Sequence, residues 1–249
     1  MNSKLKFGLG NSKLEGNVLT FDLPAGHCCP FAKDCLACVD RETRKLTDGP
    51  DTVFRCFGAS TEVRLPAVLE KHWYNYDLLK KTGLRSWKKM ADLIDASLPA
   101  EDKYIKIRIH STGGDFFNVS YFRAWCDVAR RHPSKIFYAY SKAAPIVTRD
   151  ELKPDNFRIT GSLGGTHDEI FEQLGYPTAR VVYSVEEAEE LGLEIDHDDS
   201  HAVAADHDFA LLIHNTQPKG SKAGKAMYKL RKAGLNGYGK SQKKARVSA

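Results

Sequence analysis

Four cysteines that could do chemistry together lie near the start of the chain: Cys29, Cys35, Cys38 and Cys56. The first three fall in the short run CPFAKDCLAC. Thiolates so close in sequence meet at one point when a metal ion, an iron–sulfur cluster or a pair of disulfides holds them there. Which of the three applies largely decides what the protein does.

Composition favours a metal or a cluster over disulfides. The chain has 249 residues, of which 42% are hydrophobic, and no apolar run approaches the roughly 20 residues that span a bilayer. The first residues lack the apolar core of a secretory signal. We therefore expect a cytoplasmic protein without a membrane partner, in the host cytoplasm if a phage encodes it. Stable disulfides are uncommon there, and six cysteines are too sparse for a disulfide scaffold.

Zinc competes with an iron–sulfur cluster for the same thiolates. Structural zinc sites usually pair cysteines two to four residues apart in two knuckles. Here only Cys35 and Cys38 form such a pair, and Cys56 stands alone. The spacing favours iron–sulfur, with zinc and unligated thiols as alternatives. Cys28 is interpreted as a spare neighbour that could replace the next cysteine, and Cys126 as a core residue.

Strand-like runs alternate with helical ones along the chain, which predicts βαβ units and a parallel sheet. Asn118 and Ser184 are expected to cap helices, Ser184 together with Glu187 as a capping box. We expect one α/β domain over residues 1–234, either a barrel or an open sheet, and a basic, disordered tail over 235–249. The predicted strands are 18–23, 104–110, 135–140, 157–162, 179–183 and 209–214; the predicted helices are 60–98 with a break near Gly83, 119–131, 167–174, 185–191 and 221–233.

Polar residues follow most of the predicted strands. Because the carboxyl ends of parallel strands share one edge, these residues and the cysteine loop are expected on one face. His110 and His214 are candidates for acid–base work or substrate contact, with buried, satisfied histidines as the alternative. Lys142 is a candidate proton donor or phosphate contact. The strand ends are His110 to Asp115, Ser141-Lys142, Ser162, Ser184 and His214 to Gln217.

The turn Gly113-Gly114-Asp115 is a further candidate. Two glycines let the backbone approach a ligand closely, and the carboxylate of Asp115 can accept a hydrogen bond from an ammonium or hydroxyl group. The alternative is a tight turn in which Asp115 caps the next helix.

Charge is distributed unevenly, although the net charge is only +5. From Lys219 onward the chain carries Lys and Arg but no acidic residue, which suits contact with nucleic-acid phosphates or, alternatively, a solvated helix face. Residues 196–208 are rich in Asp and His and could bind a divalent cation. We interpret this segment as a solvated loop, because consecutive residues cannot all point inward.

The chain begins with a strand, a cysteine-containing loop and a helix, followed by a strand that ends in Gly-Gly and an acidic residue. This order resembles the opening of radical S-adenosylmethionine (SAM) enzymes. The resemblance implies an incomplete parallel (β/α) barrel and a [4Fe–4S] cluster held by Cys29, Cys35 and Cys38. SAM would bind the fourth iron, with Gly113, Gly114, Asp115 and Ser162 as cofactor-binding residues. The chain departs from that pattern in four ways: its cysteine spacing is five then two, Ala37 replaces an aromatic residue, Asp115 replaces Glu, and Cys56 could occupy the fourth iron.

A second resemblance covers most of the chain. The segments AGHCCP, FRCFGAS, IRIHSTGGDFF and LIHNTQPKGS look like an uncharacterised phage family named for gene product eighty-eight. That name implies no chemistry.

The resulting hypothesis is an iron–sulfur enzyme that cleaves SAM reductively to modify an unknown substrate. A nucleic acid or nucleotide is the candidate substrate, and the electron donor is unknown. His110, Asp115, Lys142 and His214 would serve catalysis. One alternative is a nucleic-acid-binding protein with a structural four-cysteine zinc or iron–sulfur site. Another is a zinc-bearing barrel enzyme that modifies a nucleic-acid base, with Asp115 as the reacting carboxylate.

Overall fold

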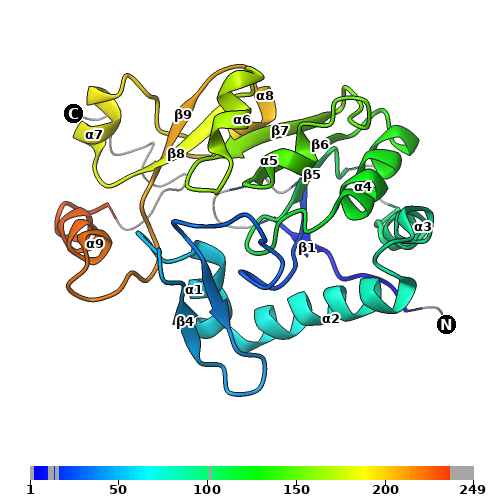
Figure 1. The fold of residues 1–249 in the computed structure, drawn as a ribbon, viewed down its shortest axis with the longest axis horizontal. Coiled ribbons are helices and arrows are strands. Elements are labelled where there is room, and N and C mark those ends of the chain that lie inside the picture. The colour runs from blue at the N-terminus through cyan, green and yellow to red at the C-terminus, as the bar shows by residue number, and fades with distance from the viewer. Residues whose placement is uncertain (1–2, 11–13, 15–16, 101–102, 236–249) are drawn as a thin grey trace.

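A single twisted sheet runs through the structure, a computed structural model that describes residues 3–10, 14, 17–100 and 103–235 (Figure 1). Its seven strands lie in the order β1-β2-β5-β6-β7-β8-β9, and all are parallel except β1 at one edge. The strands are β1 (Gly8–Leu9), β2 (Val18–Phe21), β5 (Lys106–Ile109), β6 (Ile136–Ser141), β7 (Phe157–Ser162), β8 (Thr178–Val182) and β9 (Phe209–Leu212). The predicted α/β class and its mostly parallel sheet are confirmed.

The parallel strands are neighbours in the same order in which they occur in the sequence. Right-handed crossovers between such strands place most of the connecting helices on one face. That face carries Leu19, Ile107, Phe137 and Phe157, which share the largest hydrophobic core with α3 (Trp87–Ser97) and α4 (Val119–Arg131). Alternate residues of the same strands point to the other face, as the pleat of a strand requires.

The other face of the sheet is covered by the segment around α8 (Ser200–Ala204). Asp199 forms an ion pair with Arg108 of β5, at 2.6 Å, and accepts a hydrogen bond from Tyr138 of β6. Asp196 accepts one from Tyr140 at 3.0 Å. Both carboxylates are buried, so the prediction of a solvated loop is wrong for Asp196 and Asp199. The basic and phenolic groups on the sheet draw them inward.

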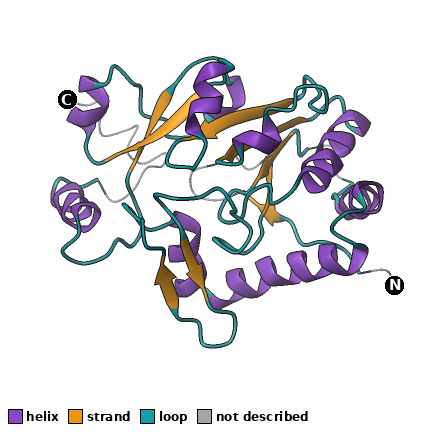
Figure 2. Ribbon diagram, in the orientation of Figure 1, coloured by secondary structure: helices purple, strands orange, loops and turns teal. Residues whose placement is uncertain are grey.

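The remaining elements surround this sheet. A separate antiparallel pair, β3 (Ala37–Val39) and β4 (Leu46–Asp48), lies beside α1 and α2, away from the main sheet (Figure 2). Neither this hairpin nor the short helices α5 and α8 were predicted. The helices not yet named are α1 (Phe57–Arg64), α2 (Pro66–Thr82), α5 (Ala144–Val147), α6 (Asp168–Gln173), α7 (Val185–Glu190) and α9 (Lys222–Lys232).

Local signals placed several boundaries correctly. The Asn118 side chain accepts a hydrogen bond from Tyr121 N at the start of α4, and Ser184 accepts one from Glu187 N at the start of α7. The predicted helix 60–98 is divided into three, because Pro66 begins α2 and Gly83 ends it. Among the helices of the described residues, none has the length and apolar character needed to cross a membrane. Of the predicted tail, residues 236–249 lie outside the described part of the chain.

Candidate functional site

The segment between β2 and β3, which we call the cysteine loop, follows β2 at the edge of the sheet where the parallel strands end, the carboxyl edge. It crosses this edge and reaches the loop after β7. Lys33 N and Asp34 N donate hydrogen bonds to Gly164 O, at 3.2 and 2.9 Å, and Thr166 N donates to Phe31 O at 3.0 Å. These bonds fix the loop at both ends, so Cys29 and Cys35 lie at the edge where the polar strand ends were expected to gather.

Cys56 reaches the same edge because the chain after β9 holds the start of α1. Gln217 pairs with the backbone of Arg55 on both sides: its Oε1 accepts from Arg55 N at 2.7 Å and its Nε2 donates to Arg55 O at 3.1 Å. Asn215 donates to Phe57 O at 3.1 Å, and the ring of His214 lies on the ring of Phe57 with 3.6 Å between centroids. Cys56 is therefore placed as the N-cap residue of α1.

Cys29, Cys35 and Cys56 form one electrostatic group. A hydrogen bond from Cys56 lowers the pKa of the Cys35 thiol to about 7, with help from the nearby Lys142 and against the effect of burial. The same bond, together with burial, raises the pKa of Cys56. Burial raises the pKa of Cys29, and the neighbouring Asp115, Cys28 and Cys35 add to this rise in that order. We call Cys29, Cys35, Cys56 and Lys142 the Cys35 side.

Cys38 belongs to a different environment. It lies in β3, which packs so closely against the cysteine loop that a Cβ added to Gly26 would be 2.4 Å from Cys38 Sγ. Burial and then Glu62 raise the pKa of Cys38, and the same two causes lead for Cys28. All six cysteines are free thiols, and no three of their sulfurs, among the described residues, lie within 4.8 Å of one another.

Glu62 lies in a buried polar region with two histidines: His72 contacts it directly, and His110 is close enough for His72 to affect its pKa. Oε1 of Glu62 accepts a hydrogen bond from Ala25 N at 2.9 Å and lies 2.6 Å from Nδ1 of His72. The other carboxylate oxygen, Nε2 of His72 and Nδ1 of His110 are buried without a hydrogen-bond partner in the described structure. We call Cys28, Cys38, Glu62, His72 and His110 the Glu62 side. Three of its polar groups thus retain unused donors or acceptors.

The Gly113-Gly114 turn is occupied by protein contacts. A Cβ on Gly113 would lie 2.7 Å from Leu23 O, and one on Gly58 of α1 would lie 1.7 Å from Thr112 O. Gly113 N donates to a carboxylate oxygen of Asp22 at 3.2 Å, and Thr112 N donates to the same oxygen. The glycines let α1, the cysteine loop and this turn approach one another closely.

The Asp115 carboxylate is buried and holds the end of β6. It accepts hydrogen bonds from Ser141 Oγ at 2.6 Å, Phe116 N at 2.7 Å and Lys142 N at 2.8 Å. Burial raises its pKa despite these bonds. Its own backbone N donates to Cys28 O at 3.1 Å. Asp115 therefore ties the cysteine loop to β6.

The ammonium group of Lys142 is held by three oxygens at the end of β7. It donates to Ser162 O at 2.7 Å, Ser162 Oγ at 3.0 Å and Leu163 O at 2.6 Å. Lys142 is only 7% exposed, so its charge is little screened by water. It is positioned to stabilise a thiolate at Cys35.

The two strand-end histidines differ. His110 has a left-handed backbone (φ 59°), and its Nε2 lies 3.2 Å from the hydroxyl of Tyr121. Burial lowers its pKa to about 3, so it stays neutral near pH 7. His214 is half-buried, with Nδ1 3.0 Å from Leu212 O. Neutral His110 cannot supply a proton as imidazolium.

Sequence reasoning missed Asp22, Glu62 and His72. Asp22 was assigned to the predicted strand 18–23, but it directly follows β2, which ends at Phe21. Glu62 and His72 lie in two different helices, α1 and α2, and only the angle between these helices brings them together.

Comparison with known proteins gives one family match. The family model described as gene product 88 matches residues 1–233. Neither a curated protein nor a solved structure matches the chain.

Proposed function

Since the chain belongs to the gene product 88 family, whose name states no activity, we propose a function from the site: an iron–sulfur enzyme with a [4Fe–4S] cluster at the carboxyl edge and SAM as its co-substrate. One observation carries the proposal. Thiols from two separate segments, Cys29 and Cys35 on the loop and Cys56 on α1, lie close enough to shift one another's pKa, and the buried ammonium group of Lys142 lowers the pKa of Cys35.

The donor set suits a cluster better than zinc. Thiolates bound 2.3 Å from one tetrahedral zinc stand roughly 3.8 Å apart. The cysteine sulfurs form no such group of three within 4.8 Å in the described structure. A four-iron cluster binds each thiolate through a different iron, which allows wider separations. The cation of Lys142 would offset part of the negative charge that several thiolates bring into a buried site.

We assign Cys29, Cys35 and Cys56 as the ligands. This set differs from the triad that the resemblance implies, because Cys38 lies with Cys28 and Glu62. Three thiolates leave one iron open, where the amino and carboxylate groups of SAM would bind. When bound, the cluster supplies the electron for reductive cleavage of SAM.

The surrounding residues have supporting roles in this proposal. Lys142 stabilises the thiolate of Cys35, and Asp115 positions the cysteine loop. His214 and Ser162 remain the strand-end groups proposed to face substrate and cofactor. The sequential order of the parallel strands is what an incomplete (β/α) barrel requires, and it supports that finer description of the fold.

Metal analysis of anaerobically purified protein tests the proposal. We expect brown protein with about four irons and four sulfides per chain, and formation of 5′-deoxyadenosine from SAM on reduction. Cys29→Ala, Cys35→Ala and Cys56→Ala should each lose the iron, whereas Cys126→Ala, a change in the distant core, should keep it. Colourless protein with one zinc per chain would contradict the proposal.

A second candidate function rests on α9. Its buried residues Ala223, Met227 and Leu230 leave the lysines and Arg231 on the outer side of the helix. Such a surface suits nucleic-acid phosphates, either as a substrate or as a partner of a protein with a structural cluster. Binding to DNA or RNA that weakens steeply with salt supports this function; absence of binding at low salt rules it out.

A further inference from the structure

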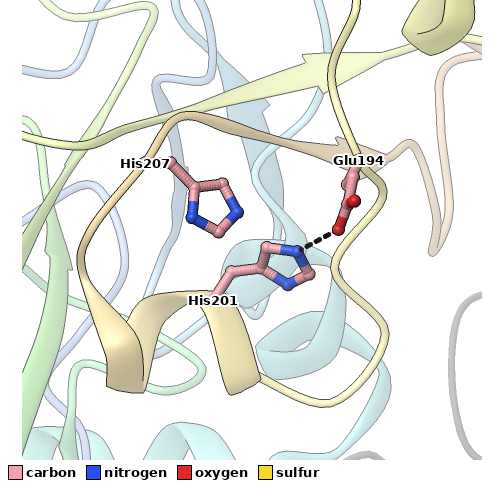
Figure 3. Close-up of side chains that lie close together, drawn as sticks. All are labelled: Glu194, His201 and His207. Atoms are coloured by element: carbon pink, nitrogen blue, oxygen red, sulfur yellow. Dashed lines mark hydrogen bonds and ion pairs between the residues drawn. The ribbon is translucent and has the colours of Figure 1, made fainter.

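The segment between α7 and β9 brings together a second group of metal-ligating side chains, Glu194, His201 and His207 (Figure 3). One ligand atom from each residue lies within 4.8 Å of the other two. Oε2 of Glu194 lies 3.0 Å from Nε2 of His201. The two imidazole rings lie with 5.0 Å between their centroids.

Three different points of the segment supply these residues. Glu194 flanks β9, because its carbonyl accepts a hydrogen bond from Ala210 N at 2.7 Å. His201 lies in α8, and His207 lies in the turn that precedes β9. The group is therefore near the amino end of β9, whereas the cysteines lie at the carboxyl edge.

Each histidine faces a carboxylate with its Nδ1. Nδ1 of His207 lies 2.5 Å from Oδ1 of Asp206. Nδ1 of His201 is buried without a hydrogen bond and lies 3.6 Å from Oδ1 of the buried Asp196. A carboxylate at Nδ1 holds the proton on that nitrogen and leaves Nε2 free to bind a metal. In proteins, the second ring nitrogen of a metal-binding histidine almost always donates to a carboxylate, a backbone carbonyl or a water molecule.

We propose that Glu194, His201 and His207 bind one divalent cation of the zinc type. Two imidazole nitrogens and one carboxylate oxygen are a common three-residue ligand set for Zn²⁺, while Ca²⁺ and Mg²⁺ prefer oxygen ligands alone. The side chain of His207 is 50% exposed and that of Glu194 is 79% exposed. Water therefore reaches the fourth coordination position.

Such an ion would join the two ends of the segment that covers one face of the sheet. The same segment carries Asp196 and Asp199, which pair with Tyr140 and Arg108. Binding would favour the folded form of the segment, since an ion that binds only the native state stabilises it.

Zinc titration of the full-length protein against a chromophoric chelator tests the site. We expect His201→Ala and His207→Ala to lose one equivalent of bound zinc relative to wild type. Asp206→Asn should bind it about tenfold more weakly, because the orienting carboxylate is lost. His132→Ala is the matched control: His132 also pairs with a carboxylate, Asp95 at 2.6 Å, but it belongs to no group of three metal-ligating side chains within the described residues.

The cysteines are the same in all these proteins, so any zinc that they take up cancels in the comparison and the difference between variants isolates the proposed site. Zinc should also raise the melting temperature of wild type more than that of His207→Ala, an exposed change that leaves the fold intact. Cobalt can replace zinc as a coloured probe. The difference between the absorption spectra of cobalt-loaded wild type and His207→Ala should contain no thiolate-to-cobalt charge-transfer bands, because this site has no cysteine ligand. Unchanged zinc stoichiometry and affinity in both histidine variants would overturn the proposal.

Discussion

The Cys35 side and the Glu62 side of the carboxyl edge contain chemically similar thiols in opposite surroundings. On the Cys35 side, a thiol hydrogen bond and the cation of Lys142 lower the pKa of Cys35 to about 7. On the Glu62 side, burial and the carboxylate of Glu62 raise the pKa of Cys28 and Cys38. At Cys35 the surroundings favour the thiolate, which is the form that binds metals. At Cys29 and Cys56, as on the Glu62 side, the raised pKa favours the neutral thiol.

This difference separates residues that are adjacent in the sequence. Cys28 N donates a hydrogen bond to Pro24 O, and Cys29 N donates to Gly26 O, so the chain turns tightly here. The turn sends the two neighbouring side chains toward different sides of the edge. Sequence spacing alone therefore does not define the ligand set.

The largest effect is expected when a cysteine on one side is replaced by alanine and compared with the same replacement on the other side. Cys35→Ala should lower the iron content of anaerobically purified protein more than about tenfold, because a thiolate ligand is lost. Cys28→Ala should retain at least half of the iron. Elemental analysis of both variants after identical purification gives the answer. Equal loss from both would show that the two sides act as one ligand set.

A substitution that alters packing, Gly58→Ala, should destabilise the structure around the Cys35 side without replacing a cysteine. Gly58 follows Cys56 closely in α1, and a Cβ there would lie 1.7 Å from Thr112 O, a backbone atom that cannot swing away. Gly58→Ala should lower the free energy of unfolding by about 3 kcal/mol. Chemical denaturation measures the change.

The control for this change is Gly49→Ala. Its Cβ would meet only the side chain of Leu36, at 3.0 Å, and that side chain can adjust. We expect a loss below about 1 kcal/mol. Equal losses for the two variants would contradict the close backbone contact between α1 and the Thr112 turn.

Sequence patterns were sufficient where one element determines the outcome. Strand alternation predicted the six parallel strands to within a few residues, and the caps Asn118 and Ser184 fixed the starts of α4 and α7. The resemblance to the phage gene-product-eighty-eight family is confirmed over residues 1–233. The cysteine loop at the carboxyl edge also follows from the parallel arrangement.

The features that the sequence did not reveal depend on contacts between distant segments. The inward turn of Asp196 and Asp199 requires Arg108, Tyr138 and Tyr140 on the far face of two strands. The separation of Cys38 from Cys35 requires the β3–β4 hairpin, whose strands of three residues each leave almost no periodic signal. Such pairings are set by tertiary packing, not by local preference.

His110 gives the Glu62 side a distinct response to pH. Its pKa is lowered to about 3, so below pH 6.5 the unfolded chain takes up a proton at this histidine that the folded protein does not. The contribution of His110 to stability therefore falls as the pH is lowered from 6.5 toward 3. Between pH 7 and pH 5 it should fall by about 2 kcal/mol.

His110→Asn tests this contribution, because asparagine tolerates the left-handed backbone at φ 59°. Unfolding of metal-free protein at pH 7 and pH 5 should show a smaller loss of stability for the variant than for wild type. His167→Asn, at an exposed position, controls for the loss of a histidine as such. The same loss in wild type and His110→Asn would mean that His110 takes up a proton in the folded state.

The smallest expected effect isolates the charge of Lys142. In metal-free, reduced protein, the alkylation rate of Cys35 follows its thiolate fraction and should rise through a midpoint near pH 7. Lys142→Gln removes the cation but keeps a donor for Ser162, so the pKa of Cys35 should rise and alkylation at pH 7 should slow by about threefold. Peptide-level mass spectrometry follows each cysteine separately.

The control for this prediction is Lys71→Gln, which removes a cation near Asp22 on the opposite side and should leave the alkylation rate of Cys35 unchanged. If Lys142→Gln leaves the rate unchanged, the hydrogen bond from Cys56 alone lowers the pKa of Cys35, and the contrast between the two sides rests on that thiol pair.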